Sequence, residues 1–148
     1  MIRIAHRGNI DGPDPSTENH PDQILKATSL GFDVEVDVWV TGDELFLGHD
    51  EPTYRVTAEY LKSIGDHAWY HCKNLLALEY LLSNMPELNF FWHEEDRFTL
   101  TSRGHIWTYP GQPVTEKSVI VDLEASNARR YGDIPYAICT DYPSTIPL

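Results

Sequence analysis

The sequence is poor in cysteine, in basic residues and in long apolar runs. Its two cysteines, Cys72 and Cys139, lie far apart and match no metal-ligand spacing, so reduced buried thiols are expected instead of a disulfide framework. With 23 Asp and Glu against 11 Lys and Arg, the net charge is −12, which argues against nucleic acid or an anionic membrane as the main partner. The sequence shows no signal peptide and no run near the roughly 18 apolar residues of a membrane helix, so a soluble, cytoplasmic protein is expected.

What is present is a globular composition. The 148 residues, 41% of them hydrophobic, predict a single domain over residues 1–148. Short apolar runs of strand length recur along the chain. Eight strands are predicted, at Ile2–Ala5, Phe32–Val40, Leu45–Gly48, Ala68–Cys72, Leu88–Trp92, His105–Tyr109, Ser118–Leu123 and Tyr136–Cys139.

Helical patterns separate several of these runs. They cover His20–Leu30, Thr57–Ile64, Asn74–Asn84 and a shorter stretch at Ala125–Tyr131. Strands that alternate with helices predict parallel βα units, with ligand groups at the C-terminal strand ends. An ordinary barrel of this type takes about 250 residues. The expectation is therefore an α/β fold, a reduced TIM-type (β/α) barrel of eight strands that lacks several outer helices. The strand surface left bare would need a second subunit, which predicts a homo-oligomer.

One predicted strand carries an unusual row of carboxylates. Residues 32–40 alternate acidic and apolar side chains, so Asp33, Glu35 and Asp37 share one face. Two interpretations are open. The carboxylates could face water on an amphipathic strand, or Glu35 and Asp37 could bind a hard divalent ion. Residues 27–54 contain seven acidic residues and no Lys or Arg, so no local side chain neutralises these carboxylates.

Histidines follow two other predicted strands. The first run leads into His6, Arg7 and Gly8, and the third leads into His49. Each histidine alone is more often structural. Beside a divalent ion, however, two histidines suit displacement at phosphorus, where one removes a proton and the other supplies one. An arginine fork matches phosphate oxygens.

These residues resemble the glycerophosphodiester phosphodiesterase family of phospholipase C-like barrels. The resemblance is specific over residues 4–50 and looser beyond. It rests on His6-Arg7-Gly8, Ser16-Thr17-Glu18-Asn19, Glu35-Val36-Asp37-Val38, Gly48-His49-Asp50, Ile106-Trp107-Thr108 and Thr140-Asp141-Tyr142-Pro143.

The resemblance implies a metal-dependent phosphoric diester hydrolase. His6 and His49 would form the acid–base pair, Arg7 would hold phosphoryl oxygens, and Glu35 and Asp37 would bind the metal, usually Mg²⁺ or Ca²⁺. The nucleophile could be water or a vicinal hydroxyl of the substrate, which would give a cyclic intermediate.

The fourth predicted strand departs from the family pattern Glu-x-Lys. Here Lys73 is retained at the phosphate position, but His71 replaces the third metal-binding carboxylate. Imidazole suits Mn²⁺ or Zn²⁺ better than Ca²⁺. Further along, His93 and Asp96 could supply a substitute ligand or belong to a solvated loop.

The substrate is expected to be a small phosphodiester. Lys73, His93 and Glu18 are the predicted substrate-binding residues, and Glu18 is also expected to order the loop after the first strand. Trp107 and Tyr109 are interpreted as core more readily than as a substrate platform. The alternative function is a phosphate- or phosphosugar-binding module of the same fold with little or no turnover.

Overall fold

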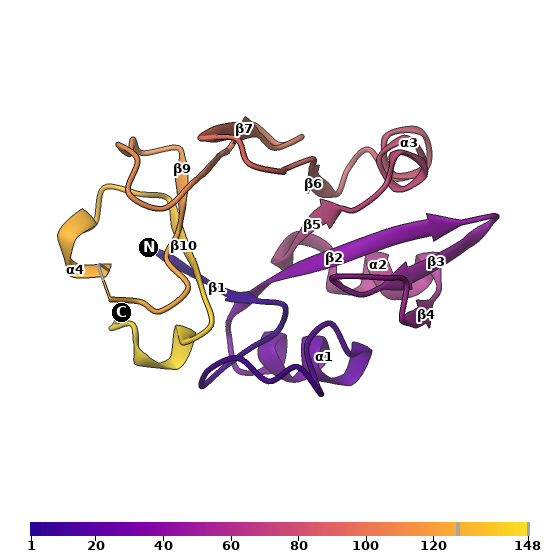
Figure 1. Ribbon diagram of the computed structural model, residues 1–148, viewed down its shortest axis with the longest axis horizontal. Coiled ribbons are helices and arrows are strands. Elements are labelled where there is room, and N and C mark those ends of the chain that lie inside the picture. The colour runs from indigo at the N-terminus through magenta and orange to yellow at the C-terminus, as the bar shows by residue number, and fades with distance from the viewer. Residues whose placement is uncertain (127, 148) are drawn as a thin grey trace.

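The fold is one mixed β-sheet that curls on itself, and a computed structural model describes it for residues 1–126 and 128–147 (Figure 1). The described residues place ten strands in this sheet. They are β1 Ile2–His6, β2 Asp33–Thr41, β3 Glu44–Leu47, β4 Tyr54–Val56, β5 Ala68–Cys72, β6 Asn89–Phe91, β7 Phe98–Leu100, β8 Ile106–Thr108, β9 Ser118–Val121 and β10 Ala137–Thr140.

The sheet is mixed, with one continuous parallel region and three strands that pair antiparallel. Strands β6, β5, β2, β1, β10, β9 and β8 follow one another as parallel neighbours. Strands β3, β4 and β7 are added by antiparallel pairing. Among the described residues β6 pairs only with β5, so the sheet curls toward a barrel but does not close between β6 and β8. The result is a half-barrel.

The expected reduced (β/α) barrel is therefore wrong. All eight predicted strand positions contain strands, but the third, now β3, folds back on β2 in an antiparallel hairpin with Thr41 opposite Glu44. The connection holds only Gly42 and Asp43, and Gly42 adopts a positive φ of 61°, which suits a tight hairpin and leaves no room for a crossover helix. Strands β4 and β7 were not predicted because Arg55 and Thr99 interrupt their short apolar stretches.

The helices lie close to their predicted positions. They are α1 Pro21–Ser29, α2 Ala58–Ile64, α3 Leu75–Asn84 and α4 Ala128–Tyr131, with 3₁₀ turns at Gly65–His67 and Pro143–Thr145. Side chains cap the first three helices: His20 accepts from the Asp22 amide, Thr57 from the Tyr60 amide and Asn74 from the Ala77 amide. No helix of the described residues is long and apolar enough to cross a membrane.

The core consists of two layers on opposite faces of the sheet. On the convex face, Val34, Val36 and Val38 of β2 are fully buried beneath apolar side chains from α1, α2 and α3. On the concave face, Ile4, Trp69, Phe91, Trp107 and Val119 fill the lower part of the half-barrel. Both cysteines are free and buried, as expected. The alternation along β2 thus directs its valines outward to the helices and its carboxylates inward.

Candidate metal centre and acid–base site

Two carboxylates project from β2 into the concave side of the half-barrel. Glu35 is 3% exposed and Asp37 is 1% exposed, whereas carboxylates are almost never buried to this degree unless they are paired. The interpretation of β2 as a strand with its carboxylates in water is therefore wrong for these two residues. Buried carboxylates that share a face repel each other unless a cation lies between them.

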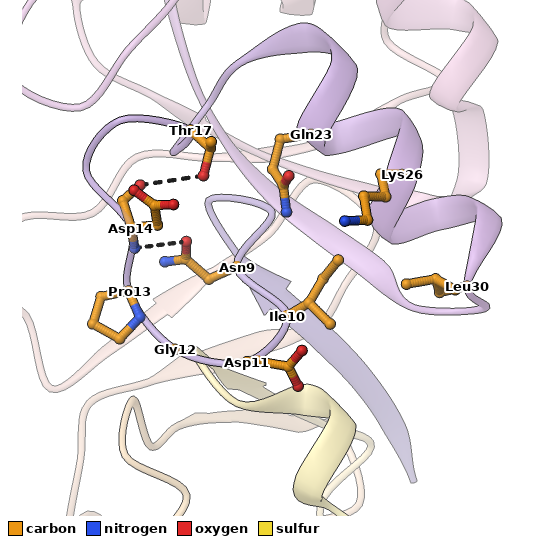
Figure 2. A pocket seen from close by; sticks show the side chains of 10 residues that line it. All are labelled: Asn9, Ile10, Asp11, Gly12, Pro13, Asp14, Thr17, Gln23, Lys26 and Leu30. Atoms are coloured by element: carbon orange, nitrogen blue, oxygen red, sulfur yellow. Dashed lines mark hydrogen bonds between the residues drawn. The ribbon is translucent and has the colours of Figure 1, made fainter.

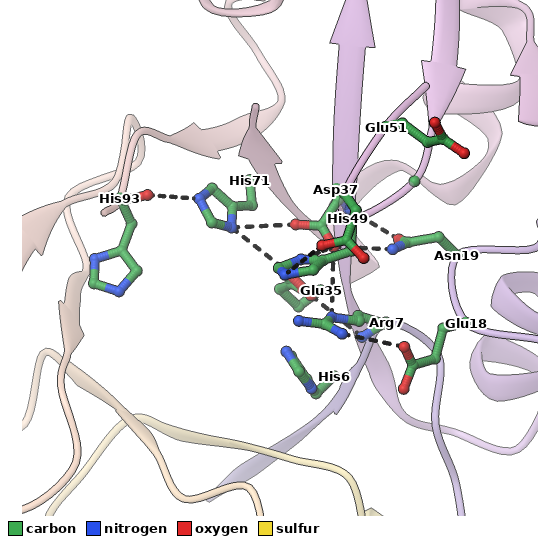
Figure 3. A network of polar contacts seen from close by, with 12 residues as sticks. His6, Arg7, Glu18, Asn19, Glu35, Asp37, His49, Glu51, His71 and His93 are labelled. Atoms are coloured by element: carbon green, nitrogen blue, oxygen red, sulfur yellow. Dashed lines mark hydrogen bonds and ion pairs between the residues drawn. The ribbon is translucent and has the colours of Figure 1, made fainter. Parts of the chain in front are cut away.

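His71 is the third member of this cluster. It lies directly opposite Asp37 in the β2–β5 ladder. Its Nδ1 is 3.2 Å from Oδ1 of Asp37 and 3.7 Å from Oε2 of Glu35 (Figure 3). One ligand atom from each of the three residues lies within 4.8 Å of the others, a spacing that a single metal ion can bridge.

The other ring nitrogen of His71 fixes its tautomer. Its Nε2 is 2.9 Å from the backbone oxygen of His93, which can only accept, so Nε2 carries a hydrogen. In the neutral ring the Nδ1 lone pair then faces the two carboxylates, where it can ligate a metal ion or bind a proton. Burial lowers the pKa of His71, but the interactions with Asp37 and Glu35 outweigh it and raise the pKa to about 9.

Asp37 is held in place from the opposite side. Asn19 donates from its side-chain amide to Oδ2 of Asp37 at 2.9 Å and accepts the Asp37 backbone N–H at 3.0 Å. Burial would raise the pKa of Asp37, but hydrogen bonds from His49 and His71 lower it below the usual range. Among the described residues, the buried Oδ1 of Asp37 has no hydrogen-bond partner of good geometry. An oriented anionic oxygen without such a partner fits a metal ligand.

The donor set of Glu35, Asp37 and His71 suits a divalent ion. Two carboxylates and one imidazole match the mixed oxygen and nitrogen sets of catalytic metal sites, in which three protein ligands leave a position for water or substrate. The protein residues that would hold the metal are thus the three that the sequence predicted.

His6 forms a dyad that the sequence did not predict. It ends β1, and its Nδ1 is 2.7 Å from Oδ1 of Asp141, which follows β10. Asn9 donates to the same oxygen at 2.9 Å. Burial lowers the pKa of His6, but the hydrogen bond to Asp141 and the charge of Glu35 raise it more, so the net pKa lies above its usual value.

The position of Asp141 was visible in the sequence, but its role was not. The residue stands two positions after a predicted strand, whereas His6 follows one directly, and the pairing of β1 with β10 brings the two ends together. Since β1 and β10 are the first and last strands of the chain, their direct parallel pairing is a contact between distant segments that no local pattern predicts. In the neutral dyad, Nδ1–H donates to Asp141 and the Nε2 lone pair is left for chemistry.

His49 reaches the same cluster through the unexpected hairpin. The Gly48 amide donates to the Asp37 carbonyl at 3.2 Å, and Nδ1 of His49 lies 3.4 Å from Oδ2 of Asp37. Only glycine fits at position 48, because its φ is 154° and a Cβ would meet the Glu51 carbonyl oxygen at 2.1 Å. The antiparallel return of β3 therefore delivers His49 to the level of Asp37.

Arg7 and Glu18 lie beside the cluster and pair with each other. Arg7 Nη1 donates to Oε2 of Glu18 at 3.1 Å, and its Nε lies 3.7 Å from Oδ2 of Asp37. With Asn19 and His49 they line a small hollow of about 190 Å³, not the main pocket over the cluster. The structure thus places Arg7 as a counter-ion to Asp37 and Glu18.

The main pocket joins the remaining predicted residues. It has a volume of about 420 Å³ and takes in His6 and His49, which the sequence predicted as an acid–base pair, the three candidate ligands and Lys73. Its complete lining is His6, Glu35, Asp37, His49, His71, Lys73, His93, Glu94, Trp107, Tyr109, Pro110, Val121 and Leu123.

His93 contributes to this pocket in two ways. Its backbone oxygen orients His71, and its ring lies at 3.0 Å from the exposed Asp96 through Nδ1. Burial lowers the pKa of His93 and the neighbouring His71 lowers it further, against the opposing effect of Asp96. His93 is therefore a neutral side chain at the rim, and Asp96 pairs with it there instead of joining the three-residue cluster.

A larger hollow of about 550 Å³ lies apart from the cluster, between the loop after β1 and helix α1 (Figure 2). It is lined by backbone and mixed polar side chains that include Asp11, Asp14, Gln23 and Lys26. It contains no histidine and none of the three candidate ligands. Volume alone would favour this hollow, but His6, His49, Lys73 and the three candidate ligands line the smaller pocket.

Comparisons of the chain with protein-family models, with curated proteins and with solved structures give no match.

Proposed function

We propose that this protein is a metal-dependent phosphodiesterase that cleaves a small phosphodiester by histidine acid–base catalysis. One observation carries the proposal. Two histidines from separate strands and Lys73 open into the same pocket as the buried cluster of Glu35, Asp37 and His71. The resemblance of the motifs to glycerophosphodiester phosphodiesterases supports the same reaction.

The cluster would position the phosphate. Glu35, Asp37 and His71 would hold a divalent ion, which when bound supplies positive charge to the phosphoryl oxygens. Lys73 adds a second positive charge on the same side of the pocket. Together, the divalent ion and Lys73 would make the substrate-binding region locally positive, although the net charge of the protein is −12.

The histidines would move the protons. His6, held at Nδ1 by Asp141, accepts at Nε2 the proton of the attacking hydroxyl as the new P–O bond forms. His49 donates a proton to the oxygen of the departing alcohol as the old P–O bond breaks. The products are an alcohol and a phosphomonoester when water attacks, and general acid–base catalysis of this kind contributes about 10²–10⁴-fold in rate.

The test is cleavage of a panel of glycerophosphodiesters with Mn²⁺, Zn²⁺, Mg²⁺ or EDTA. We expect EDTA to abolish product formation, and His6→Ala and His49→Ala to lower kcat by about 10²–10⁴-fold. His67→Ala is the matched control, because His67 pairs with Asp33 and is not part of the pocket lining. Wild-type rates equal to those of both pocket variants would contradict the proposal.

A second candidate function is phosphate binding without turnover. Its support is the interaction of His71 with both carboxylates, since an imidazolium with a pKa of about 9 compensates one of their two negative charges without a metal ion. Saturable binding of inorganic phosphate by calorimetry, together with no product from any ester in the panel, would favour this function over hydrolysis.

Two further expectations from the sequence stay proposals. A cytoplasmic location is supported by the two free buried thiols, which suit a reducing compartment. A homo-oligomer is supported by exposed leucines on α3 and β7, of which Leu75, Leu82 and Leu100 are each more than 60% exposed.

A further inference from the structure

The main pocket has two chemically different sides. Its polar side comes from β1, β2, β5, the turn after β3 and the segment after β6, and it carries the candidate ligands, His6, His49, Lys73, His93 and Glu94. Its other side comes from the C-terminal ends of β8 and β9. That side, called here the apolar wall, consists of Trp107, Tyr109, Pro110, Val121 and Leu123.

The wall is exposed where a ligand could reach it. Tyr109 is 47% exposed and Leu123 is 36% exposed, although both line a pocket and carry large apolar groups. Val121 ends β9 and Leu123 lies in the turn that follows, and both side chains line the pocket. The interpretation of Tyr109 as core is therefore wrong, whereas that of Trp107, 4% exposed, is confirmed.

The wall is also rigidly connected to the candidate metal centre. The ring of Trp107 stacks on Phe91 with centroids 4.4 Å apart, and Phe91 stacks on His71 at 5.2 Å. These buried rings fix the spacing between the wall and the cluster. When a phosphate group is bound at the candidate metal centre, a substituent on that phosphate is therefore held at a fixed distance from the wall.

The chemistry of the wall favours an apolar group over a sugar or polyol. Hydroxyl groups that leave water need hydrogen-bonding partners, and the side chains of the five wall residues offer only one phenol and one indole N–H. Pro110, Val121 and Leu123 present only carbon atoms. Such a surface gains free energy when it covers an alkyl or aryl group.

We infer that the substrate is an asymmetric phosphodiester with one apolar ester group. The phosphate lies at the polar side, and an alkyl or aryl substituent lies against Tyr109, Pro110, Val121 and Leu123. This inference rests on the proposed function for the identity of the phosphate-binding side. It adds a specificity-determining surface and narrows the substrate class from phosphodiesters in general to those with an apolar substituent.

The test uses two non-hydrolysable probes, methylphosphonate and hexylphosphonate, whose binding is measured by calorimetry in the presence of Mn²⁺. We expect hexylphosphonate to bind about 30-fold more tightly, since burial of two to three of its additional methylenes gives a ratio of that order. In Leu123→Asn the ratio should fall below about 5, and Leu123→Met should restore it. Leu82→Asn is the control, because Leu82 is exposed on α3 and outside the pocket lining.

Each alternative result is decisive. Equal affinity for the two probes in the wild-type protein, or no binding of either, overturns the inference. A chain-length effect that persists unchanged in both Leu123→Asn and Tyr109→Ser also overturns it, because the chain then lies elsewhere. Chain-length-dependent binding without cleavage of any ester would contradict the proposed hydrolysis and leave the apolar wall established. Cleavage of glycerophosphodiesters together with equal affinities for the two probes would support the proposed hydrolysis and contradict the role of the apolar wall.

Discussion

The two halves of the curled sheet differ in what they bring to the site. The half formed by β1 to β6 carries three of the four helices in the described residues and supplies the candidate ligands, both histidines and Lys73. The half formed by β7 to β10 carries only the short α4, and it supplies Asp141 and the apolar wall (Figure 1). In the proposed function the two halves would have different tasks: the first half would bind the metal and move protons, and the second would orient His6 and shape the pocket.

The largest expected effect comes from Asp37→Asn in the first half. Asp37 touches His71, His49 and Asn19, and its buried Oδ1, which accepts no hydrogen bond in the described residues, is the oxygen most suited to a metal ion. We expect metal affinity to fall by more than about 100-fold, which exceeds the usual cost of removing an outer-sphere partner, and cleavage to be lost. Calorimetric titration with Mn²⁺ measures the affinity. Unchanged Mn²⁺ binding in Asp37→Asn would contradict the assignment of the metal site to the first half.

The next effect concerns the stability of the metal-free protein as the pH rises. The pKa of His71 is raised from 6.5 to about 9, since its interactions with Asp37 and Glu35 outweigh burial, and such a shift corresponds to about 3 kcal/mol. Because the folded pKa is the higher one, this stabilisation is complete below about pH 6.5 and is lost as the pH rises to about 9.

Thermal unfolding in EDTA from pH 6 to 10 measures this loss. We expect Tm to fall across that window in the wild-type protein and in His67→Gln, and the decline to be much smaller in His71→Gln. A decline of the same size in His71→Gln would assign the pH dependence to other groups.

The smallest of the three effects comes from Asp141→Asn in the second half. The substitution keeps the shape of the side chain but weakens its hold on His6, so we expect kcat to fall about 10- to 100-fold while Mn²⁺ affinity stays within about 3-fold. Since Asp141 raises the pKa of His6, the rise of kcat/KM with pH that reports the free base should move to lower pH. If Asp141→Asn lost as much metal affinity as Asp37→Asn, metal binding could not be assigned to the first half alone.

The candidate site was more predictable from the sequence than the fold. The alternation of Asp33 to Val38 is a local property of one strand, so it correctly placed Glu35 and Asp37 on one buried face. His71 was predicted from its position in a strand motif. Local patterns of this kind place the same residues on one face of a strand in a closed barrel and in an open, curled sheet.

What the sequence did not reveal depends on pairing between distant segments. The antiparallel return of β3 follows from the turn at Gly42, but an apolar run such as Leu45–Gly48 has the same pattern in either direction. The dyad of His6 with Asp141 joins residues 135 positions apart, through a ladder between the first and last strands. Likewise, Tyr109 and Leu123 become a pocket wall only because the sheet curls.

The most direct measurement is an anomalous-difference map of crystals soaked with Mn²⁺ or Zn²⁺. The proposed metal-dependent function predicts one strong peak at about 2.0–2.3 Å from a carboxylate oxygen of Glu35, from Oδ1 of Asp37 and from Nδ1 of His71. A peak bound by other residues, or a fully ordered cluster with no peak at saturating metal, would contradict it.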